Sequence, residues 1–276
     1  MIDAQSPTGV SSWFIRPTKR PAARALLFCF PRSGGGASSF RNWAEACDPN
    51  IEVILIQPPG RESRLREPPL TSMQSLATAV ADALPAYLDR PFAFYGHSLG
   101  GKTSFETARE LRRRGLPSPV HLYAAACSAP SVPWRHPSLH ELPTDDLLRE
   151  VQRRYGGVPQ QIAADPELCA LLVPALRADI AVIETYRYSE EAPLATPITC
   201  FCGAQDAMTP EPEAIEWRRH TSAAFRFEMF PGEHFFPTAS RKPILDVIAS
   251  DLGFGPLDSA PAIASKKDLE VGAFRS

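Results

Sequence analysis

Three side chains in this chain could together carry out nucleophilic catalysis: Ser98, Asp206 and His234. A serine hydroxyl is a weak nucleophile near pH 7 and needs a neutral imidazole to take its proton as it attacks. The imidazole in turn needs a carboxylate that fixes its tautomer and stabilises the imidazolium. We therefore predict that Ser98 is the nucleophile, His234 the base and Asp206 the orienting acid.

The stretch around Ser98 supplies the local structure that a nucleophilic serine needs. An apolar run that follows Pro91 predicts a short buried strand, and a helix is predicted from Lys102 to Arg114. Between them stands Gly96-His97-Ser98-Leu99-Gly100, and strand, Gly-x-Ser-x-Gly and helix together define a nucleophile elbow. The glycines are needed because the turn is so tight that a Cβ would clash. The alternative is a serine in an ordinary glycine-rich turn.

Asp206 and His234 also follow predicted strands. An apolar run over 197–202 precedes Asp206, and alternating apolar residues over 225–229 precede His234. In a parallel sheet the loops at the carboxyl ends of the strands lie along one edge, so these loops should meet the elbow. The chain order Ser, Asp, His is also the order found in α/β-hydrolases.

Other histidines and aspartates are weaker candidates. The competing histidines lie beside the nucleophile, in a strand, in an irregular segment or at a helix end: His97, His121, His136, His140 and His220. The competing aspartates lie in predicted helices whose surroundings indicate solvated faces: Asp145, Asp179 and Asp246.

A glycine-rich loop offers backbone donors for an oxyanion. A predicted strand over 25–30 runs into Arg32-Ser33-Gly34-Gly35-Gly36, where a hydrolase with a serine elbow holds its second oxyanion donor. We predict the backbone N–H groups of Leu99 and Ser33 as the two donors. The loop lacks the Lys-Ser/Thr pair of a phosphate-binding P-loop and the G-x-G-x-x-G spacing of a dinucleotide site. A merely structural turn is the alternative.

Predicted strands and helices alternate along the chain, which predicts an α/β fold with a mostly parallel central sheet and helices on both faces. Thr71 and Gln74 are expected to cap the helix that leads to the elbow strand. No strand is predicted over about 130–196, where Thr144 should cap one helix, Gly156 should end it, Asp165-Pro166 should open a second and Pro174 should break that one. We expect this insertion to be a helical lid over the site, with ordinary packing helices as the alternative.

Composition sets the class of protein. The chain has 276 residues, of which 44% are hydrophobic, and a net charge of -2, which gives no reason to expect nucleic acid or an anionic membrane as partner. It has neither a run of about 20 apolar residues nor a signal-peptide pattern, so a cytoplasmic location is expected. The six cysteines are expected to be buried free thiols, and no metal or cofactor is expected. We predict flexible tails at 1–12 and 253–276 around one domain, 13–252.

Several motifs together resemble the type II thioesterases that accompany polyketide and non-ribosomal peptide synthases. The resemblance spans about 13–252 and depends on motifs spread along the chain: Trp13-Phe14, Phe30-Pro31-x-x-Gly34-Gly35, Gln57-x-Pro59-Gly60-Arg61, the Ser98 elbow, Asp165-Pro166-Glu167-Leu168, Leu176-Arg177-Ala178-Asp179 and Pro231-Gly232-x-His234-Phe235-Phe236. The family's catalytic serine, aspartate and histidine fall on Ser98, Asp206 and His234, and its oxyanion-loop amide falls near Ser33.

The resemblance implies an α/β-hydrolase fold and hydrolysis of acyl groups from the phosphopantetheine arm of an acyl- or peptidyl-carrier protein. We also expect a monomer that needs no cofactor. The chain departs from the family at Arg32-Ser33, where His-Ala is usual, and at the polar segment Gly101-Lys102-Thr103-Ser104, where the helix usually begins with apolar residues. We expect Lys102 to face solvent, and likewise the arginines at 61, 64, 66 and 112–114. The alternatives are contact of Lys102 with an acidic carrier protein and a docking surface formed by the arginines. Two other functions remain open: a carboxylesterase or lipase that acts on oxygen esters, and a catalytically vestigial protein that binds carrier proteins.

Overall fold

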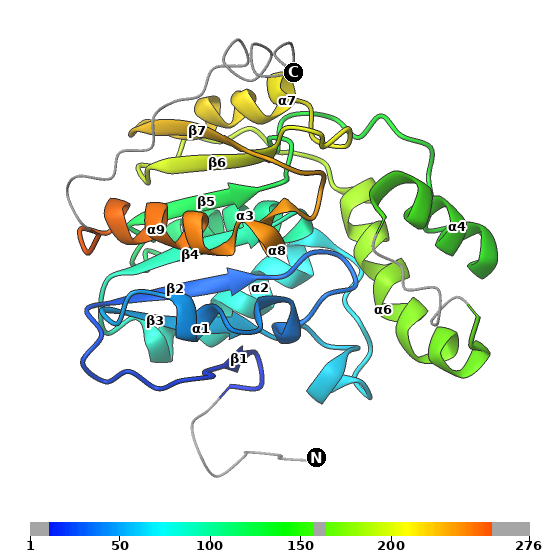
Figure 1. Ribbon diagram of the computed structural model, residues 1–276, viewed down its shortest axis with the longest axis horizontal. Coiled ribbons are helices and arrows are strands. Elements are labelled where there is room, and N and C mark those ends of the chain that lie inside the picture. Colours follow the sequence, from blue (N-terminus) through cyan, green and yellow to red (C-terminus); the bar gives the residue numbers. More distant parts are fainter. Residues whose placement is uncertain (1–10, 157–163, 256–276) are drawn as a thin grey trace, which may run out of the picture.

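The computed structural model describes residues 11–156 and 164–255, so the predicted tails lie almost wholly outside the described residues. Seven strands of the described chain form one sheet in the order β1-β3-β2-β4-β5-β6-β7 (Figure 1). Their bounds are Phe14–Ile15 (β1), Ala25–Phe30 (β2), Ile51–Ile56 (β3), Phe92–His97 (β4), His121–Ala125 (β5), Ile198–Gly203 (β6) and Phe225–Phe230 (β7). Every neighbouring pair is parallel except β1 and β3. The prediction of an α/β fold is confirmed, but the two-residue edge strand β1 was not predicted.

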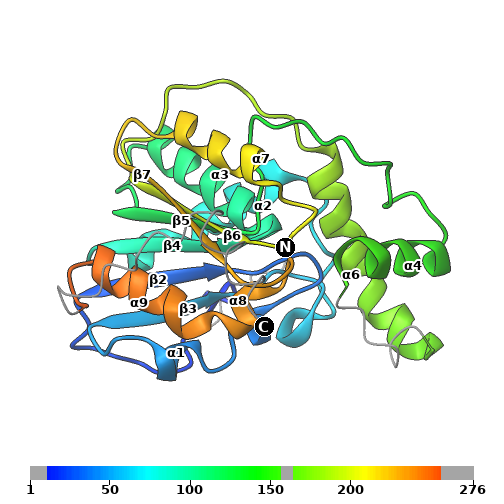
Figure 2. The same cartoon turned by 45° about the horizontal axis from the view of Figure 1, so that its top comes forward.

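Helices cover both faces of the sheet because its central strands are apolar on both faces. Successive residues of a strand point to opposite faces, so Phe28 and Phe94 belong to one buried cluster and Cys29 and Tyr95 to the other. The first cluster is covered by α2 (Met73–Ala83), α3 (Leu99–Arg113) and α7 (Glu211–Ile215). The second is covered by α1 (Trp43–Ala46), α8 (Phe236–Ala239) and α9 (Arg241–Asp251) (Figure 2). Short 3-10 helices complete the described structure: Ala37–Phe40, Glu62–Arg64, Leu84–Tyr87 and Glu216–His220.

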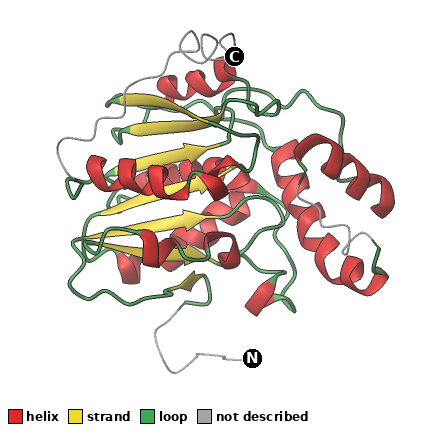
Figure 3. Cartoon of the chain, viewed as in Figure 1, coloured by secondary structure: helices red, strands yellow, loops and turns green. Residues whose placement is uncertain are grey.

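A helical insertion follows β5 and lies beyond the carboxyl ends of the strands (Figures 1 and 3). It contains α4 (Thr144–Tyr155) and α6 (Pro166–Thr185), which pack through an apolar cluster of their own. That cluster includes Leu147, Val151 and Ile180, and it is separate from the two clusters that cover the sheet. The insertion therefore stands over the edge of the sheet where the predicted catalytic loops end.

The predicted helix boundaries are partly right. Asp165 caps α6 by accepting hydrogen bonds from the N–H groups of the second and third residues after it, and α4 ends at Gly156, which has a left-handed φ of 69°. Thr144 is instead the first helical residue and caps nothing, and Ser72 rather than Thr71 caps α2. Pro174 does not break α6, because it is exposed on the helix surface, where water can satisfy the carbonyl that it leaves unpaired.

Candidate active site

Ser98 occupies a sharp turn between β4 and α3. Its φ of 55° and ψ of -117° lie in a region that non-glycine residues rarely adopt, and such strain is a hallmark of functional turns. A Cβ at Gly96 would lie 2.2 Å from the Gly100 carbonyl oxygen, and one at Gly100 would lie 2.1 Å from the Phe30 carbonyl oxygen. Only glycine fits at these two positions. The two glycines of Gly-x-Ser-x-Gly are therefore needed for the steric reason predicted from the sequence.

Ser98, His234 and Asp206 form a continuous chain of hydrogen bonds. The His234 Nε2 atom lies 3.0 Å from Ser98 Oγ, and His234 Nδ1 lies 2.9 Å from Asp206 Oδ2. Asp206 follows β6 and His234 follows the neighbouring strand β7, so the sheet brings together loops that are far apart in sequence. Since a carboxylate only accepts, Nδ1–H donates to Asp206 and leaves Nε2 free to accept the Ser98 proton. The residues named from their spacing thus meet in the geometry that nucleophilic attack requires.

The environment of Asp206 keeps it charged. Burial alone would raise the pKa of Asp206, but hydrogen bonds from His234, the Met208 N–H and Thr209 outweigh burial and lower it. The Met208 N–H donates to Asp206 Oδ1 at 2.9 Å, so both carboxylate oxygens have donors. A carboxylate held in this way favours one tautomer of His234 and would stabilise an imidazolium at this position.

His97, expected only to point away from the site, supports the loop that carries His234. Its Nε2–H donates to the His234 carbonyl oxygen at 3.0 Å. Burial first, and the neighbouring His234 second, lower the pKa of His97 to about 3, so its ring is neutral at pH 7. The sequence signal was the position of His97 beside the nucleophile, but only the structure reveals the contact with the His234 backbone.

The backbone of the glycine-rich loop narrows the choice of oxyanion donor. The Gly34 N–H donates to Asp179 Oδ2 at 2.7 Å, and the Gly35 N–H donates to the Arg32 carbonyl at 2.9 Å. These two donors are already engaged, whereas Ser33 lines the same cavity as Ser98. The assignment of the Ser33 and Leu99 N–H groups as the two oxyanion donors stays a prediction.

Asp179 and Arg61 form a buried ion pair that sequence reasoning missed, because both were expected to face solvent. Arg61 Nη2 lies 2.9 Å from Asp179 Oδ1, and Arg61 Nη1 also donates to the Gly35 carbonyl at 3.1 Å. Asp179 on α6 bonds to the Gly34 N–H and Arg61 bonds to the Gly35 carbonyl, so the pair joins α6 to the glycine-rich loop. Two of the motifs that carry the family resemblance, those ending at Arg61 and at Asp179, therefore meet in one cluster.

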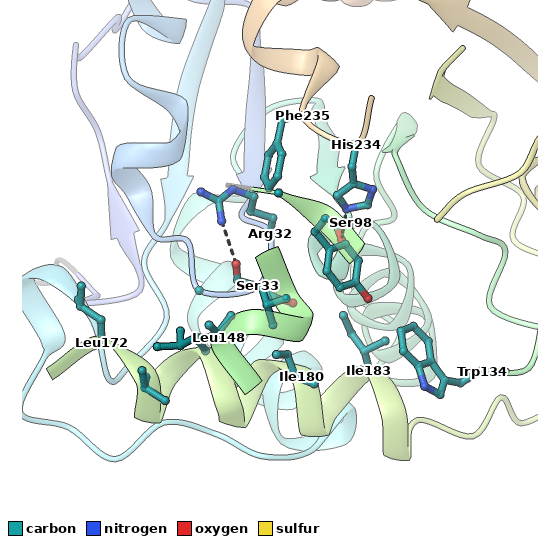
Figure 4. A pocket seen from close by; sticks show the side chains of 16 residues that line it. Arg32, Ser33, Ser98, Trp134, Leu148, Leu172, Ile180, Ile183, His234 and Phe235 are labelled. Carbon is teal, nitrogen blue, oxygen red and sulfur yellow. Dashed lines mark hydrogen bonds between the residues drawn. The ribbon is translucent and has the colours of Figure 1, made fainter. Parts of the chain in front are cut away.

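An apolar cavity of about 250 Å³ opens on Ser98 and His234 (Figure 4). The insertion helices supply most of its wall: Leu148, Val151, Leu172, Val173, Leu176, Ile180 and Ile183. Tyr155 also lines it and packs edge-on to the His234 ring, with 5.3 Å between ring centroids. The cavity can hold an apolar chain whose reactive end reaches Ser98.

The remaining predicted residues have other roles. The histidines at 121, 140 and 220 bond to Thr199, Glu184 and Ser131. Five cysteines are buried free thiols as expected (Cys29, Cys47, Cys127, Cys200 and Cys202), and Cys169 is half-buried.

Lys102 is only 8% exposed, and Arg64 is also buried, so the expectation that they face solvent was wrong. Burial of a charged side chain depends on partners from other elements, which local sequence does not reveal.

Across residues 11–156 and 164–255, no group of three or more metal-binding side chains comes together. Within the same ranges, every helix is too short or too polar to cross a membrane.

Comparisons with known proteins identify the family of the chain. The family model described as "Thioesterase domain" matches residues 25–252. The gramicidin S biosynthesis protein GrsT of Aneurinibacillus migulanus is 37% identical over 88% of this chain and 94% of its own length. The thioesterase PikA5 of Streptomyces venezuelae is 38% identical over 83% of this chain and 82% of its own. The solved type II thioesterase BorB, from the borrelidin biosynthetic cluster, superposes with a TM-score of 0.80 at 32% identity over 90% of this chain and 99% of its own. The chain therefore belongs to the thioesterase family, as a type II thioesterase of the α/β-hydrolase fold that hydrolyses thioesters.

Proposed function

We propose that this enzyme removes acyl groups from the phosphopantetheine arm of carrier proteins of a polyketide or non-ribosomal peptide synthase, in editing or in product release. The observation that carries the proposal is the hydrogen-bonded chain Ser98–His234–Asp206 at the mouth of an apolar cavity. Its relatives GrsT and BorB belong by name to the biosynthesis of gramicidin S and borrelidin.

In the proposed mechanism, His234 Nε2 takes the Ser98 proton while Ser98 Oγ attacks the thioester carbonyl. The negative charge on the carbonyl oxygen is stabilised by the N–H groups of Leu99 and Ser33. The intermediate collapses as the C–S bond breaks, and the leaving thiolate takes the proton from His234. Water, activated by His234, then hydrolyses the Ser98 ester, which releases the acid and restores the hydroxyl.

The proposal also assigns the helical insertion as a lid. Its helices have their own apolar cluster and supply the cavity wall, so they can adapt to the acyl chain without disturbing the sheet. We further propose a monomeric enzyme in the cytoplasm, where the carrier proteins of such synthases are loaded.

The decisive experiment presents one acyl group in three forms: on a holo carrier protein, on N-acetylcysteamine and as an oxygen ester. Wild type is compared with Ser98→Ala and His234→Ala. We expect the highest kcat/KM for the carrier-bound thioester and loss of turnover in both variants. Faster turnover of the oxygen ester would indicate a general esterase. Absence of turnover with several chain lengths, together with binding of the carrier protein, would indicate a binding protein instead.

A further inference from the structure

The Ser33 Oγ atom is buried, and none of the residues that the structure describes forms a hydrogen bond with it. The backbone around this hydroxyl is held in place. The Ser33 carbonyl accepts a hydrogen bond from Arg32 Nη1 at 3.0 Å, and the Gly34 N–H donates to Asp179. Leaving a buried polar group unpaired is costly, so such a group in the wall of a binding cavity is expected to meet its partner on a ligand.

The sheet places Ser33 beside the nucleophile. Strands β2 and β4 are parallel neighbours, and Phe30 lies opposite Gly96 in their register. Ser33 and Ser98 therefore follow the carboxyl ends of adjacent strands at nearly the same level. A Cβ at Gly100 would lie 2.1 Å from the Phe30 carbonyl oxygen, so the two loops are in close contact here. Both serines line the apolar cavity, where Figure 4 shows them.

A hydroxyl at this place can serve the reaction as a hydrogen-bond donor. When Ser98 Oγ attacks a thioester, the carbonyl oxygen becomes an oxyanion, which accepts hydrogen bonds and donates none. The proposed function assigns the Ser33 N–H to that oxygen, and the hydroxyl of the same residue can turn toward it about the Cα–Cβ bond. Hydrogen bonds from O–H groups to an anionic oxygen are short and strong, so the oxyanion would gain more from this donor than the neutral carbonyl does.

We propose that Ser33 Oγ–H donates a third hydrogen bond to the oxyanion, beside the N–H groups of Leu99 and Ser33. The inference rests on the proposed function and adds a catalytic residue to it. The Ser33 hydroxyl keeps its proton throughout, and the Ser98 proton still passes through His234 to the leaving thiolate. Alanine, which is usual at this position in the family, cannot supply this bond, so the third donor belongs to this chain's own sequence.

The test compares wild type with Ser33→Ala, Ser33→Thr and Ser33→Val on an octanoyl N-acetylcysteamine thioester. All three variants keep the backbone N–H, and threonine and valine have nearly the same shape but differ in the hydroxyl. We expect kcat to fall by roughly 10- to 1000-fold in Ser33→Ala and Ser33→Val, with little change in KM, because an oxyanion donor acts mainly in the transition state. Ser33→Thr should retain most of kcat. Ser39→Ala is the matched control, because Ser39 is exposed in the same segment and lies outside the cavity wall.

A second measurement separates the hydrogen bond from a change in the shape of the cavity. A heptyl trifluoromethyl ketone forms a bond between its carbonyl carbon and Ser98 Oγ, while the Ser98 proton passes to His234 and the carbonyl oxygen becomes an oxyanion. The corresponding secondary alcohol fills the cavity without forming an oxyanion. The Ki of the ketone should rise in Ser33→Ala in parallel with the fall in kcat, and the Ki of the alcohol should stay the same. An equal rise for both inhibitors overturns the proposal, because it indicates a purely structural role for Ser33.

The outcomes distinguish the two proposals. Turnover of the thioester by wild type with an unchanged kcat in Ser33→Ala overturns the Ser33 proposal alone, and so does an equal loss of kcat in Ser33→Thr and Ser33→Val. Failure of wild type to hydrolyse any thioester overturns the proposed function itself. The Kd of the trifluoromethyl ketone, measured by its protection of Ser98 from a fluorophosphonate, then decides the role of Ser33. Weaker binding in Ser33→Ala than in wild type supports the third donor, and equal binding overturns it.

Discussion

Asp179 Oδ2 on α6 accepts a hydrogen bond from the Gly34 N–H at 2.7 Å, and thereby joins the helical insertion to the glycine-rich loop. The other oxygen of the same carboxylate lies 2.9 Å from Arg61 Nη2. Arg61 in turn donates to the Gly35 carbonyl. The loop beside Ser98 is thus held through one donor, the Gly34 N–H, and one acceptor, the Gly35 carbonyl. We expect Asp179 to position the neighbouring Ser33 through this contact.

Replacing Asp179 by Ala should destabilise the protein and slow catalysis. The change leaves the Arg61 guanidinium buried without its carboxylate, and breaking a buried ion pair typically costs about 3–5 kcal/mol. Urea unfolding monitored by tryptophan fluorescence measures the loss. The control is Asp246→Ala, because the Lys242–Asp246 pair is exposed and such pairs contribute about 1 kcal/mol or less. Equal stability of the two variants would contradict the role assigned to Asp179.

Asp206→Asn should lower kcat by about 10⁴-fold while the fold is kept, because an amide facing His234 Nδ1 selects the wrong tautomer. Single-turnover hydrolysis of a thioester measures the effect. Labelling of Ser98 by a fluorophosphonate should slow in parallel, since it depends on the same base. Unchanged labelling would show that another group takes the Ser98 proton.

Ile180→Phe should reduce turnover of long acyl chains more than that of short ones, because Ile180 is buried and lines the apolar cavity. We expect KM to rise several-fold for an octanoyl thioester and to change little for an acetyl thioester. Leu171→Phe is the matched control on the same helix, since Leu171 is 48% exposed and lies outside the cavity wall. A uniform fall for both chain lengths in Ile180→Phe would point to a distorted insertion instead of a filled cavity.

Stability should fall as the pH drops below about 6.5. Burial lowers the pKa of His97 to about 3 and those of His121 and His220 to about 4. The unfolded chain, in which these rings have a pKa near the ordinary value of 6.5, then binds more protons than the folded one. The stability that their neutral forms confer is complete above pH 6.5 and is lost as the pH falls toward 4, by at most about 1.4 kcal/mol per pH unit for each ring.

Urea unfolding at pH 7.5, 6 and 5 measures this slope. His121→Gln removes one of the three rings and should make the slope shallower, while His136→Gln, at an exposed position, should not. An identical slope for wild type and His121→Gln would show that this ring does not contribute.

The sequence predicted the central sheet and the three residues of the hydrogen-bonded chain because these depend on local patterns. Apolar runs identify the strands, and Asp206 and His234 stand in the loops that directly follow two of them. A parallel sheet then places the ends of its strands on one edge whatever the sequence separation. No knowledge of the packing was needed for this step.

Charged residues that become buried could not be predicted in the same way. Lys102, Arg61 and Asp179 were expected to face solvent, but each is at most 8% exposed. Arg61 and Asp179 are 118 positions apart, and only the packing of α6 on the glycine-rich loop pairs them. The predicted cap at Thr71 was wrong for a different reason. The adjacent residues Thr71 and Ser72 can both cap α2, and the choice depends on where the backbone turns.

The proposed chemistry and the proposed acyl-binding wall come from different parts of this chain. Ser98, Asp206 and His234 all stand on loops of the sheet, whereas most of the apolar cavity is lined by α4 and α6, which have a core of their own. Substrate range can therefore diverge between relatives, or be redesigned by grafting a new insertion, while the sheet is inherited unchanged. Every such graft must keep an acidic residue at the position of Asp179, because this carboxylate accepts the hydrogen bond of the Gly34 N–H and pairs with Arg61.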